Sequence, residues 1–469
     1  MAQSKEAKNH PLLLLSLLFI FNISPCFSLN NITNLPGFDG PLPFYFETGY
    51  VEVDEVKGVE LFYYFIKSEG FPAKDPLLLW LTGGPGCSAF SGLVFEIGPL
   101  QFDVAGYTEG LPSLVYNPLS WTKVSSIIFL DSPVDAGFSY AKKQAGYVAG
   151  DLITARQILV FLKKWLSDHP EFISNPLYIG GDSYSGITVP VASSEIVKSN
   201  HASDGLKLNL KGYLVGNGAT DYLNFDGNSK VPFAHGMGLI SDEMYEAAKN
   251  TCGGQYLLPP NPECAKNVET INECLQGINV VHILEPLCGF ASPKRDVISA
   301  DRKKPIGYNE EEFSLLKLGL PVECRDSGYR LSYVWADDGA VREALGIRKG
   351  SIGSWMRCNY SQNYANDFTS VIELHRNLTA QGYQALIYSG DHDMDMPFVG
   401  TEAWVRSLGF PIVDDWRSWW VDGQVAGYTR TYSNNFTFAT VKGAGHTAPE
   451  YKPKECLAMV QRWFSSLPL

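Results

Sequence analysis

The stretch of sequence that decides the fold is IGGDSYSG, at Ile179–Gly186. An apolar run leads into it, and a helix-like stretch, Ile187–Lys198, follows it. Small residues around Ser183 let the chain turn sharply, so that the serine hydroxyl stands clear of a sheet and the first N–H groups of the next helix face a developing oxyanion. The stretch therefore predicts a nucleophile elbow. It departs from the strict Gly-x-Ser-x-Gly pattern at Ser185, and a serine between glycines, taken alone, more often marks a simple turn.

Strand-like and helix-like segments alternate along the rest of the chain. Asp151–Leu166 carries its apolar residues on one side and predicts a helix that Asp151 caps. Short apolar runs predict buried strands, and the C-terminus predicts a helix near Lys454–Phe464. The strands are expected at Pro76–Leu81, Ser126–Leu130, Leu177–Gly180, Tyr213–Val215 and Gln384–Tyr388. This alternation implies a mainly parallel sheet and, with the elbow, an α/β-hydrolase fold.

A nucleophilic serine needs a base, and the base needs an orienting carboxylate. Hydrolases with this elbow carry the three residues in the order Ser, acid, His. SGDHD, at Ser389–Asp393, follows a predicted strand, and KGAGHTAP, at Lys442–Pro449, places His446 in a glycine-rich loop after another. The order and the positions at strand ends predict a catalytic triad of Ser183, an aspartate and His446.

The acid of this triad is ambiguous from the residues alone. Asp391 and Asp393 lie in the same loop. His392 stands between them rather than on a separate later loop, so a surface or hydrogen-bonding role suits it better than that of the base.

WLTGGPGCS, at Trp80–Ser88, ends a predicted strand in consecutive glycines. Backbone N–H groups can approach a ligand closely there because no Cβ intervenes. A tight structural turn is the alternative, but beside a nucleophile elbow the loop is better explained as part of an oxyanion hole.

Composition limits the class of protein. The chain has 469 residues, room for one large domain with an insertion or for two domains. Its net charge of −13 argues against a nucleic-acid partner, because too little positive charge is present to neutralise phosphates. Neither a Cys-x-x-Cys pair nor a Cys/His cluster with zinc spacing occurs in the sequence. We therefore expect no metal and no cofactor.

The first 28 residues predict a secretory signal peptide. Lys5 and Lys8 precede the apolar run Pro11–Phe21, and small residues suit cleavage after Ser28. A membrane span needs ~20 apolar residues, about twice this run, so no stable span is expected. We expect passage through the secretory pathway to the vacuole, with the cell exterior as the alternative. Eight cysteines remain after residue 28 and indicate disulfides. Sequons predict glycans at Asn31, Asn359, Asn377 and Asn435.

Residues 221–350 differ from the alternating pattern and predict an insertion over the sheet. Five cysteines fall in this stretch, and Ser292–Lys304 is a polar run with five basic residues. The favoured interpretation of that run is a solvated loop. The alternative is an excised linker, whose cleavage leaves two chains held by a disulfide. The expected division is a core at 29–220, the insertion at 221–350 and the rest of the core at 351–469.

Four ordered motifs, GGPGCS, GDSYSG, SGDHD and GAGHTAPEYKP, resemble the serine carboxypeptidase family from about Leu35 to the C-terminus. The resemblance implies that Ser183 is the nucleophile, Asp393 the acid and His446 the base. It also implies that residues 221–350 are a cap that shapes the pocket. The oxyanion hole would consist of the N–H groups of Gly84 and Tyr184. The implied disulfides are Cys87–Cys358, Cys252–Cys264 and Cys288–Cys324, which leave Cys274 and Cys456.

The resemblance places Trp80, Thr82, Gly83, Glu96 and Asp182 in the substrate pocket. Carboxypeptidases of this kind have Asn in place of Thr82 and Glu in place of Asp182, and these residues help to hold a peptide's terminal carboxylate. A threonine hydroxyl is shorter than an Asn amide, and losing one hydrogen bond to a charged group costs ~1.5–3 kcal/mol, roughly 10- to 150-fold in affinity. Asp182 also withdraws its carboxyl by one methylene from the carboxyl pair that could share a proton. Both changes indicate a different substrate.

Longer segments resemble the plant acyltransferase branch of the family, whose members use 1-O-β-glucose esters as donors. These segments are Trp80–Gly92, Ser389–Trp404 and Asp414–Tyr432. One departure is Asp135, which stands where that branch usually has Gly and puts the choice of donor in question. The sequence thus predicts a cofactor-free acyltransferase of plant specialised metabolism that passes the acyl group from a glucose ester through Ser183 to an acceptor hydroxyl. Its expected partners are these small molecules alone, and its expected form is a monomer or a disulfide-linked pair of chains.

Three alternatives to the transferase stay open at this point. A serine carboxypeptidase would release C-terminal residues from peptides, and a plain esterase would pass the acyl group to water. A non-catalytic glycoprotein would keep the fold as a binding module, although the complete triad argues against it.

Overall fold

The computed structural model describes residues 30–203, 205–288 and 325–469. The expected signal peptide and the basic run at 292–304 lie outside the described residues. Within those three ranges, no helix is long and apolar enough to cross a bilayer.

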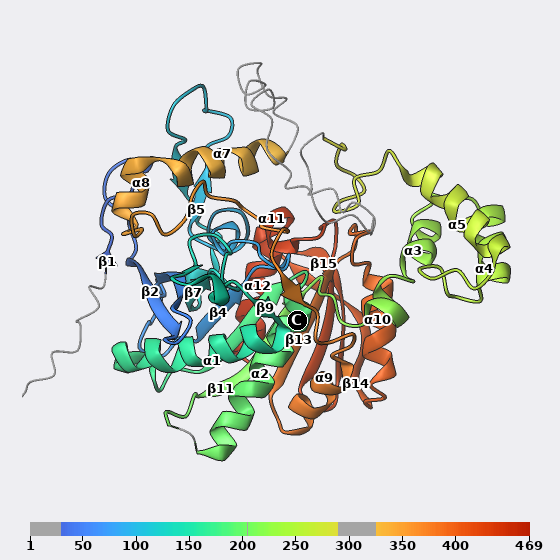
Figure 1. The fold of residues 1–469 in the computed structure, drawn as a ribbon. Helices are drawn as coiled ribbons and strands as arrows, with labels where there is room; N and C mark the ends of the chain where they lie inside the picture. The colour runs from blue at the N-terminus through green and yellow to red at the C-terminus, as the bar shows by residue number, and fades with distance from the viewer. Residues whose placement is uncertain (1–29, 204, 289–324) are drawn as a thin grey trace, which may run out of the picture.

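A twelve-stranded sheet forms the centre of the molecule (Figure 1), in the order β1-β2-β3-β7-β4-β10-β11-β13-β16-β15-β14, with β8 paired to β3. The strands are β1 Asn30–Asn31, β2 Phe46–Asp54, β3 Val59–Ile66, β4 Leu77–Leu81, β7 Ser126–Leu130, β8 Tyr140–Ala141, β10 Leu177–Asp182, β11 Leu210–Gly216, β13 Gln384–Gly390, β14 Ile412–Val421, β15 Gln424–Tyr432 and β16 Phe436–Val441. The six strands from β7 to β16 in that order are parallel to one another. Each strand outside them pairs antiparallel with its neighbour. The predicted mainly parallel sheet is therefore confirmed.

Helices cover both faces of the sheet. Leu79 of β4 packs into an apolar cluster with α1, α2, α9 and α10, whereas Leu78 packs into a second cluster with α7, α8 and α12. Since side chains alternate across a strand, the two clusters lie on opposite faces. The helices are α1 Asp151–Asp168, α2 Ser185–Ala202, α3 Lys230–Gly236, α4 Asp242–Cys252, α5 Pro262–Leu275, α7 Asp326–Asp337, α8 Gly339–Ala344, α9 Ile372–Ala380, α10 Phe398–Ser407, α11 Ala448–Tyr451 and α12 Pro453–Phe464.

Two small strand pairs complete the fold. They are β5 (Leu100–Phe102) with β6 (Leu114–Tyr116), and β9 (Ala149–Gly150) with β12 (Tyr364–Ala365). Every residue of β4 and β7 is buried, which explains their continuous apolar sequences, because a parallel strand covered on both faces needs no polar side.

The start of α1 differs from its prediction. Gly150, not Asp151, is the N-cap residue, and Asp367 caps the helix from a distant segment by accepting from the N–H of its second residue at 2.9 Å. The buried Asp151 carboxylate instead accepts hydrogen bonds from the hydroxyls of Tyr184 (2.8 Å) and Tyr364 (2.9 Å). Asp151 therefore ties α1 to the elbow rather than capping the helix.

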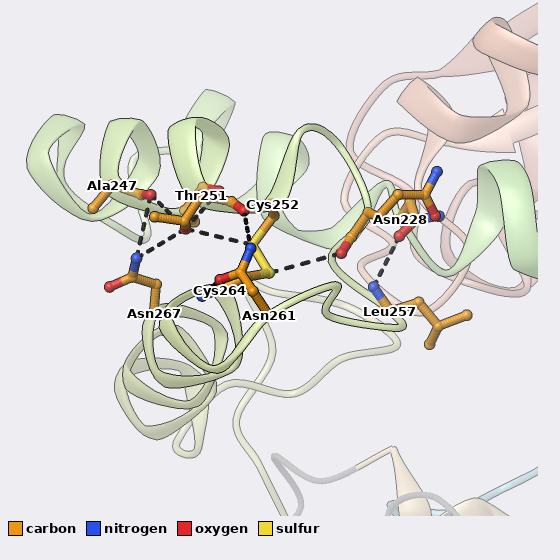
Figure 2. Close-up of a disulfide and its surroundings, with 10 residues drawn as sticks. Asn228, Ala247, Thr251, Cys252, Leu257, Asn261, Cys264 and Asn267 are labelled. Atoms are coloured by element: carbon orange, nitrogen blue, oxygen red, sulfur yellow. Dashed lines mark hydrogen bonds between the residues drawn. A yellow bond between two sulfur atoms is a disulfide. The ribbon is translucent and has the colours of Figure 1, made fainter.

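Helices α3, α4 and α5 lie to one side of the sheet and share an apolar cluster of their own (Figure 1). Figure 2 shows the Cys252–Cys264 disulfide, which joins the end of α4 to the start of α5. Asn261 supports it: its Oδ1 accepts from the N–H of Cys264 and its Nδ2 donates to the carbonyl of Thr251, both at 2.8 Å. Helices α7 and α8, from the same 221–350 stretch, pack on the main sheet instead. The cap assignment of this whole stretch stays a prediction.

A second disulfide, Cys87–Cys358, joins residues 271 positions apart and ties the glycine-rich loop after β4 to the segment before β12. Cys288 is disulfide-bonded as well, and Cys324, its expected partner, lies outside the described residues. The free cysteines in the described ranges are Cys274 and Cys456.

Candidate active site

The turn between β10 and α2 carries Ser183 at φ +55°, in the left-handed region that few side chains adopt. Glycine at 186 is required because a Cβ there would lie 2.2 Å from the carbonyl oxygen of Ala219. Ser185 fits in place of the usual glycine, since its hydroxyl donates to the carbonyl of Leu81 at 3.1 Å. The sharp strand–turn–helix geometry predicted for this stretch is present, and it holds the Ser183 side chain above the ends of the parallel strands.

His446 lies between Ser183 and Asp393. Its Nε2 is 2.8 Å from Ser183 Oγ, and its Nδ1 is 2.8 Å from Asp393 Oδ2. Asp393 is buried and also accepts from Asn217 Nδ2 at 2.8 Å and from the backbone N–H of Asp395 at 2.8 Å. These bonds hold the carboxylate in one orientation toward the imidazole.

Asp391 has different neighbours. One of its carboxylate oxygens accepts from the N–H of Gly443 at 2.6 Å and lies 2.5 Å from Nδ1 of His392. The ambiguity between the two aspartates is thus resolved by geometry, because it is Asp393 that contacts His446.

The charge of the His446 ring is set by opposing effects. Burial disfavours the imidazolium, but the Asp393 carboxylate, which also hydrogen-bonds the ring, outweighs it. The negative charges of Asp395 and Asp182 add to this effect, and the pKa of His446 is raised to about 9. The site therefore favours a positive imidazolium, the form that arises when a base takes a proton from serine.

The loop after β4 lies directly against the elbow. A Cβ at Gly83 would stand 2.5 Å from Ser183 Cβ and 2.7 Å from the backbone nitrogen of Tyr184. Gly84 adopts φ +119°, which only glycine reaches without strain. Gly83, next to Gly84, thus lies against Ser183 and the Tyr184 backbone nitrogen, and an oxyanion hole made by the N–H groups of Gly84 and Tyr184 stays a prediction.

Asp131, at the end of β7, fixes the far end of this loop. One carboxylate oxygen accepts from the Ser88 hydroxyl (2.7 Å) and the Ala89 N–H (2.8 Å), and the other accepts from the Phe138 N–H (2.8 Å). Burial raises the pKa of Asp131 to about 7 in spite of these donors. No local pattern in the sequence predicts this role, because the loop residues that Asp131 holds, Ser88 and Ala89, lie more than 40 positions before it.

The predicted pocket residues Trp80, Glu96 and Asp182 lie near one another beneath the loop. Trp80 Nε1 donates to Glu96 Oε2 at 2.8 Å, and Asp182 Oδ1 accepts from the Gly83 N–H at 3.3 Å. Burial raises the pKa of Asp182 to about 6. Burial, together with the charge of Asp182, raises the pKa of Glu96 well above its usual range. Each carboxyl is thus held by its own donor while the two repel electrostatically.

Thr82 has a hydroxyl that is buried and meets no hydrogen-bond partner in the described part of the chain. It lines a small recess together with Ser132 and Thr154, whose hydroxyls likewise have no hydrogen-bond partner among the described residues. The side chain that replaces the carboxypeptidase Asn therefore contributes to this space and bonds to none of the described residues.

Two further charged residues border the pocket, and both were missed from the sequence. Glu450, on α11, accepts from the hydroxyls of Tyr329 (2.8 Å) and Thr447 (2.7 Å). The Arg357 guanidinium lies 4.4 Å from the centre of the Tyr329 ring, and its positive charge works to lower the pKa of Glu96. Glu450 stands four residues after His446, and Arg357 directly precedes Cys358. Neither position in the sequence indicates that the side chain lies near Glu96 in the fold.

The sequon at Asn359 does not fit a surface glycan. Asn359 is only 5 % exposed, its Nδ2 donates to Asp135 Oδ2 at 2.8 Å and its Oδ1 accepts from the Ser361 hydroxyl at 2.6 Å. The amide nitrogen that a glycan would occupy is therefore already used inside the protein. The other three sequon asparagines, Asn31, Asn377 and Asn435, are exposed, and glycans there stay a prediction.

A metal centre has no candidate in the described ranges, where no three His, Cys, Asp or Glu side chains are placed to hold an ion. The side chains that do meet here are a hydroxyl, an imidazole and a carboxylate in line, beside the glycine-rich loop after β4.

Comparison with known proteins identifies the class. The family model for serine carboxypeptidase matches residues 36–466, and the chain belongs to the serine carboxypeptidase family. It is 50% identical to serine carboxypeptidase-like 1 of Arabidopsis thaliana over 444 residues, 94% of each chain. It is 49% identical to serine carboxypeptidase-like 2 of the same plant, over 98% of this chain and 97% of the relative.

Among solved structures, the prohormone-processing carboxypeptidase Kex1(delta)p from Saccharomyces cerevisiae superposes with a TM-score of 0.73 at 21% identity. The match covers 93% of this chain and 96% of that one. The predicted α/β-hydrolase fold is thereby confirmed.

Proposed function

We propose that the protein is an acyltransferase that moves an acyl group from a 1-O-β-glucose ester to an acceptor hydroxyl. The observation that carries this proposal is how the pocket uses its polar groups. The indole N–H of Trp80 donates to Glu96, Asp182 accepts from the backbone, and the Thr82 hydroxyl lines a small recess. None of these four residues has an amide to donate to a peptide's terminal carboxylate, and the donor among them that has no partner in the described chain is the shorter Thr82 hydroxyl. This supports a substrate other than a peptide.

In the proposed first half-reaction, His446 takes the proton of Ser183 while Ser183 Oγ bonds to the ester carbonyl carbon. The N–H groups of Gly84 and Tyr184 stabilise the resulting oxyanion, and the Asp393 carboxylate stabilises the imidazolium. His446 then gives its proton to the anomeric oxygen as the bond to the acyl carbon breaks. Glucose leaves, and Ser183 carries the acyl group as an ester.

In the second half-reaction, His446 takes the proton of an acceptor hydroxyl, whose oxygen bonds to the acyl carbon. The bond to Ser183 Oγ breaks, and His446 returns the proton to Ser183. Transfer wins over hydrolysis when the acceptor is held in place or water is excluded. Proximity alone is worth several kcal/mol, about 7–11 in well-oriented cases, enough to decide that competition.

A carboxypeptidase is the second candidate, and the raised pKa values favour it at low pH. Below the pKa of about 6, Asp182 carries a proton, and burial also raises the pKa of Glu96 well above its usual range. A protonated carboxyl can donate to a terminal carboxylate. A peptide could then bind through these two acids although Thr82 lacks an amide.

The test uses the purified protein at a series of pH values from 5 to 9, because His446, with a pKa of about 9, must lose its proton before it can act as the base. The substrates are a panel of 1-O-β-glucose esters plus pooled hydroxyl acceptors, and separately a blocked dipeptide. We expect new ester products that disappear in Ser183→Ala and persist in Ser185→Ala. Ser185 is a matched control because its hydroxyl bonds only the Leu81 carbonyl in this region. Dipeptide cleavage without ester products would overturn the transferase and establish the carboxypeptidase.

The disulfides fit an oxidising compartment such as the secretory pathway. We propose the vacuole as the destination, with the cell exterior as the alternative. We also propose small-molecule donor and acceptor partners and a monomer or processed two-chain form. Mass spectrometry of the purified protein, before and after reduction, tests the last point through the number and masses of its chains.

A further inference from the structure

A cavity of about 610 Å³ opens to the surface beside the segment that the Cys87–Cys358 disulfide anchors. Its size is within the range of small-molecule sites. The residues that line it come from the turn that contains Asp135, from the segment 144–147 and from the stretch 351–363. The triad residues are absent from its described lining, so this cavity is separate from the catalytic contacts already described.

The lining has the chemistry of a site for hydroxyl groups. Amides of Gln144, Gln362 and Asn363 and the hydroxyls of three serines supply both donors and acceptors, and Tyr147 adds an aromatic ring. Asp135 is the single charged side chain among the described lining residues. An anionic ligand is disfavoured by that carboxylate. A ring with hydroxyls on its edge and C–H groups on its faces matches all of these groups.

Asp135 occupies a backbone position suited to glycine. Its φ is +72°, a conformation in which an L side chain is strained. One of its carboxylate oxygens accepts from Asn359 Nδ2, which fixes the side chain in place. A charged residue kept at such a position points to a use for its carboxylate, because glycine would cost less there.

Gln362 supplies the second observation. Both polar atoms of its amide are buried, and neither has a hydrogen-bond partner in the described structure. Leaving a buried amide unpaired is costly, so a partner from outside the described chain is expected there. The amide also packs against Gly86, where a Cβ would lie 3.0 Å from its Nε2. The cavity wall therefore contacts the loop that carries the predicted oxyanion donors.

We propose that this cavity binds an uncharged polyhydroxylated ring, with the Asp135 carboxylate accepting from ring hydroxyls and the Gln362 amide pairing with others. The source of the ring is either the glucosyl group of the acyl donor or a separate sugar or polyol molecule. Only the first source rests on the proposed function, since binding of the ring itself requires no acyl transfer.

The test is a calorimetric titration of the Ser183→Ala protein with methyl β-D-glucopyranoside. We expect saturable binding that weakens about tenfold or more when Asp135→Gly is added, and less steeply when Gln362→Ala is added. Asp135→Gly should fold, because glycine suits φ +72°, and thermal melting checks this. The matched control is Asp422→Gly, an exposed aspartate at φ +48° in the β14–β15 turn, which should leave the affinity unchanged.

A repeat of the titration with 1-O-acyl glucose present separates the two sources. Loss of glucoside binding assigns the cavity to the donor's own glucosyl group, and persistence assigns it to a second molecule. No saturable binding, or binding unaffected by both cavity variants, overturns the proposal. If binding behaves as expected but the wild-type protein makes no ester products, the proposed function is wrong and the ring-binding proposal is supported. If ester products form without glucoside binding, the ring-binding proposal is wrong and the proposed function is supported.

Discussion

Asp393 and Asp391 stand two residues apart, and at the scale of single residues their contacts predict opposite outcomes. Asp393→Asn removes the charged acceptor at His446 Nδ1, so the imidazole loses its orienting partner and its pKa falls from about 9 toward the ordinary range. We expect turnover of an activated ester to drop about 10³- to 10⁴-fold. Asp391→Asn should cost at most a few-fold. Equal losses in both variants would contradict the assignment of the acid.

The pocket residues Thr82 and Asp182 allow a gain-of-function experiment. Thr82→Asn combined with Asp182→Glu restores an amide donor and a longer carboxyl, so kcat/KM for a blocked dipeptide should rise about tenfold or more. Thr82→Val is the matched control, because it removes a hydroxyl that has no partner among the described residues and keeps the shape. A double variant with the dipeptide activity of the wild type would mean that these residues do not select the substrate.

At the scale of elements, the two described disulfides are expected to differ in their effects on stability and on activity. Cys87–Cys358 closes 271 residues and anchors the loop beside Ser183, whereas Cys252–Cys264 closes 12 residues between α4 and α5 (Figure 2). Chain-entropy arguments assign about 6 kcal/mol to the long bridge and about 3 kcal/mol to the short one. We expect the Cys87→Ser, Cys358→Ser pair to lose more stability in urea than the Cys252→Ser, Cys264→Ser pair, and to lose esterase activity beyond its unfolded fraction.

The short-bridge pair should keep its activity per folded molecule. Equal activity losses in the two pairs, measured where both are fully folded, would show that the long bridge does not position the loop.

The elements also show what a sequence can and cannot predict. The elbow, the loop after β4 and the strand-end positions of the acid and histidine follow from local patterns, because a turn between strand and helix needs small residues close together. Asp131 and the cap of α1 do not follow, since their partners lie far along the chain: Asp367 is 215 residues from the N–H it caps. The sequon at Asn359 suggested a glycan for the same reason: the burial of Asn359 against Asp135 depends on the tertiary structure and is not visible in the local sequence.

At the scale of the whole molecule, buried acids predict that stability falls as pH rises. Burial raises the pKa of Asp131 to about 7 and those of Asp182 and Asp226 to about 6. An unfolded Asp titrates near ~3.9, so between pH 4 and 6 the folded state holds protons that the unfolded state has released. Each such proton lowers the unfolding free energy by about 1.4 kcal/mol per pH unit of increase.

The histidines modify this balance on either side of pH 6.5. Burial lowers the pKa of His375 to about 3 and also lowers that of His282, so these two residues oppose the acids below pH 6.5, while the raised pKa values of Glu96 and Asp135 add to the effect of the acids. Above pH 6.5, His446 adds to the acids, because its folded pKa of about 9 exceeds the unfolded value of ~6.5 and its contribution is lost as pH rises through that window. Below and above pH 6.5 alike, the folded protein is therefore expected to be more stable at the lower pH.

We expect the melting temperature to be higher at pH 5 than at pH 8 by roughly 3–10 °C, measured by calorimetry at constant ionic strength. Asp226→Asn tests the cause away from the triad: Asp226 accepts from the N–H groups of Thr220 and Asp221, and an Asn oxygen can still accept from both. Because the variant stays neutral at every pH, it should melt at about the wild-type temperature at pH 5 and at a higher temperature than the wild type at pH 8, which flattens the dependence on pH. A melting temperature that rises from pH 5 to pH 8 would mean that these acids are ionised in the folded protein and are stabilised there by their donors.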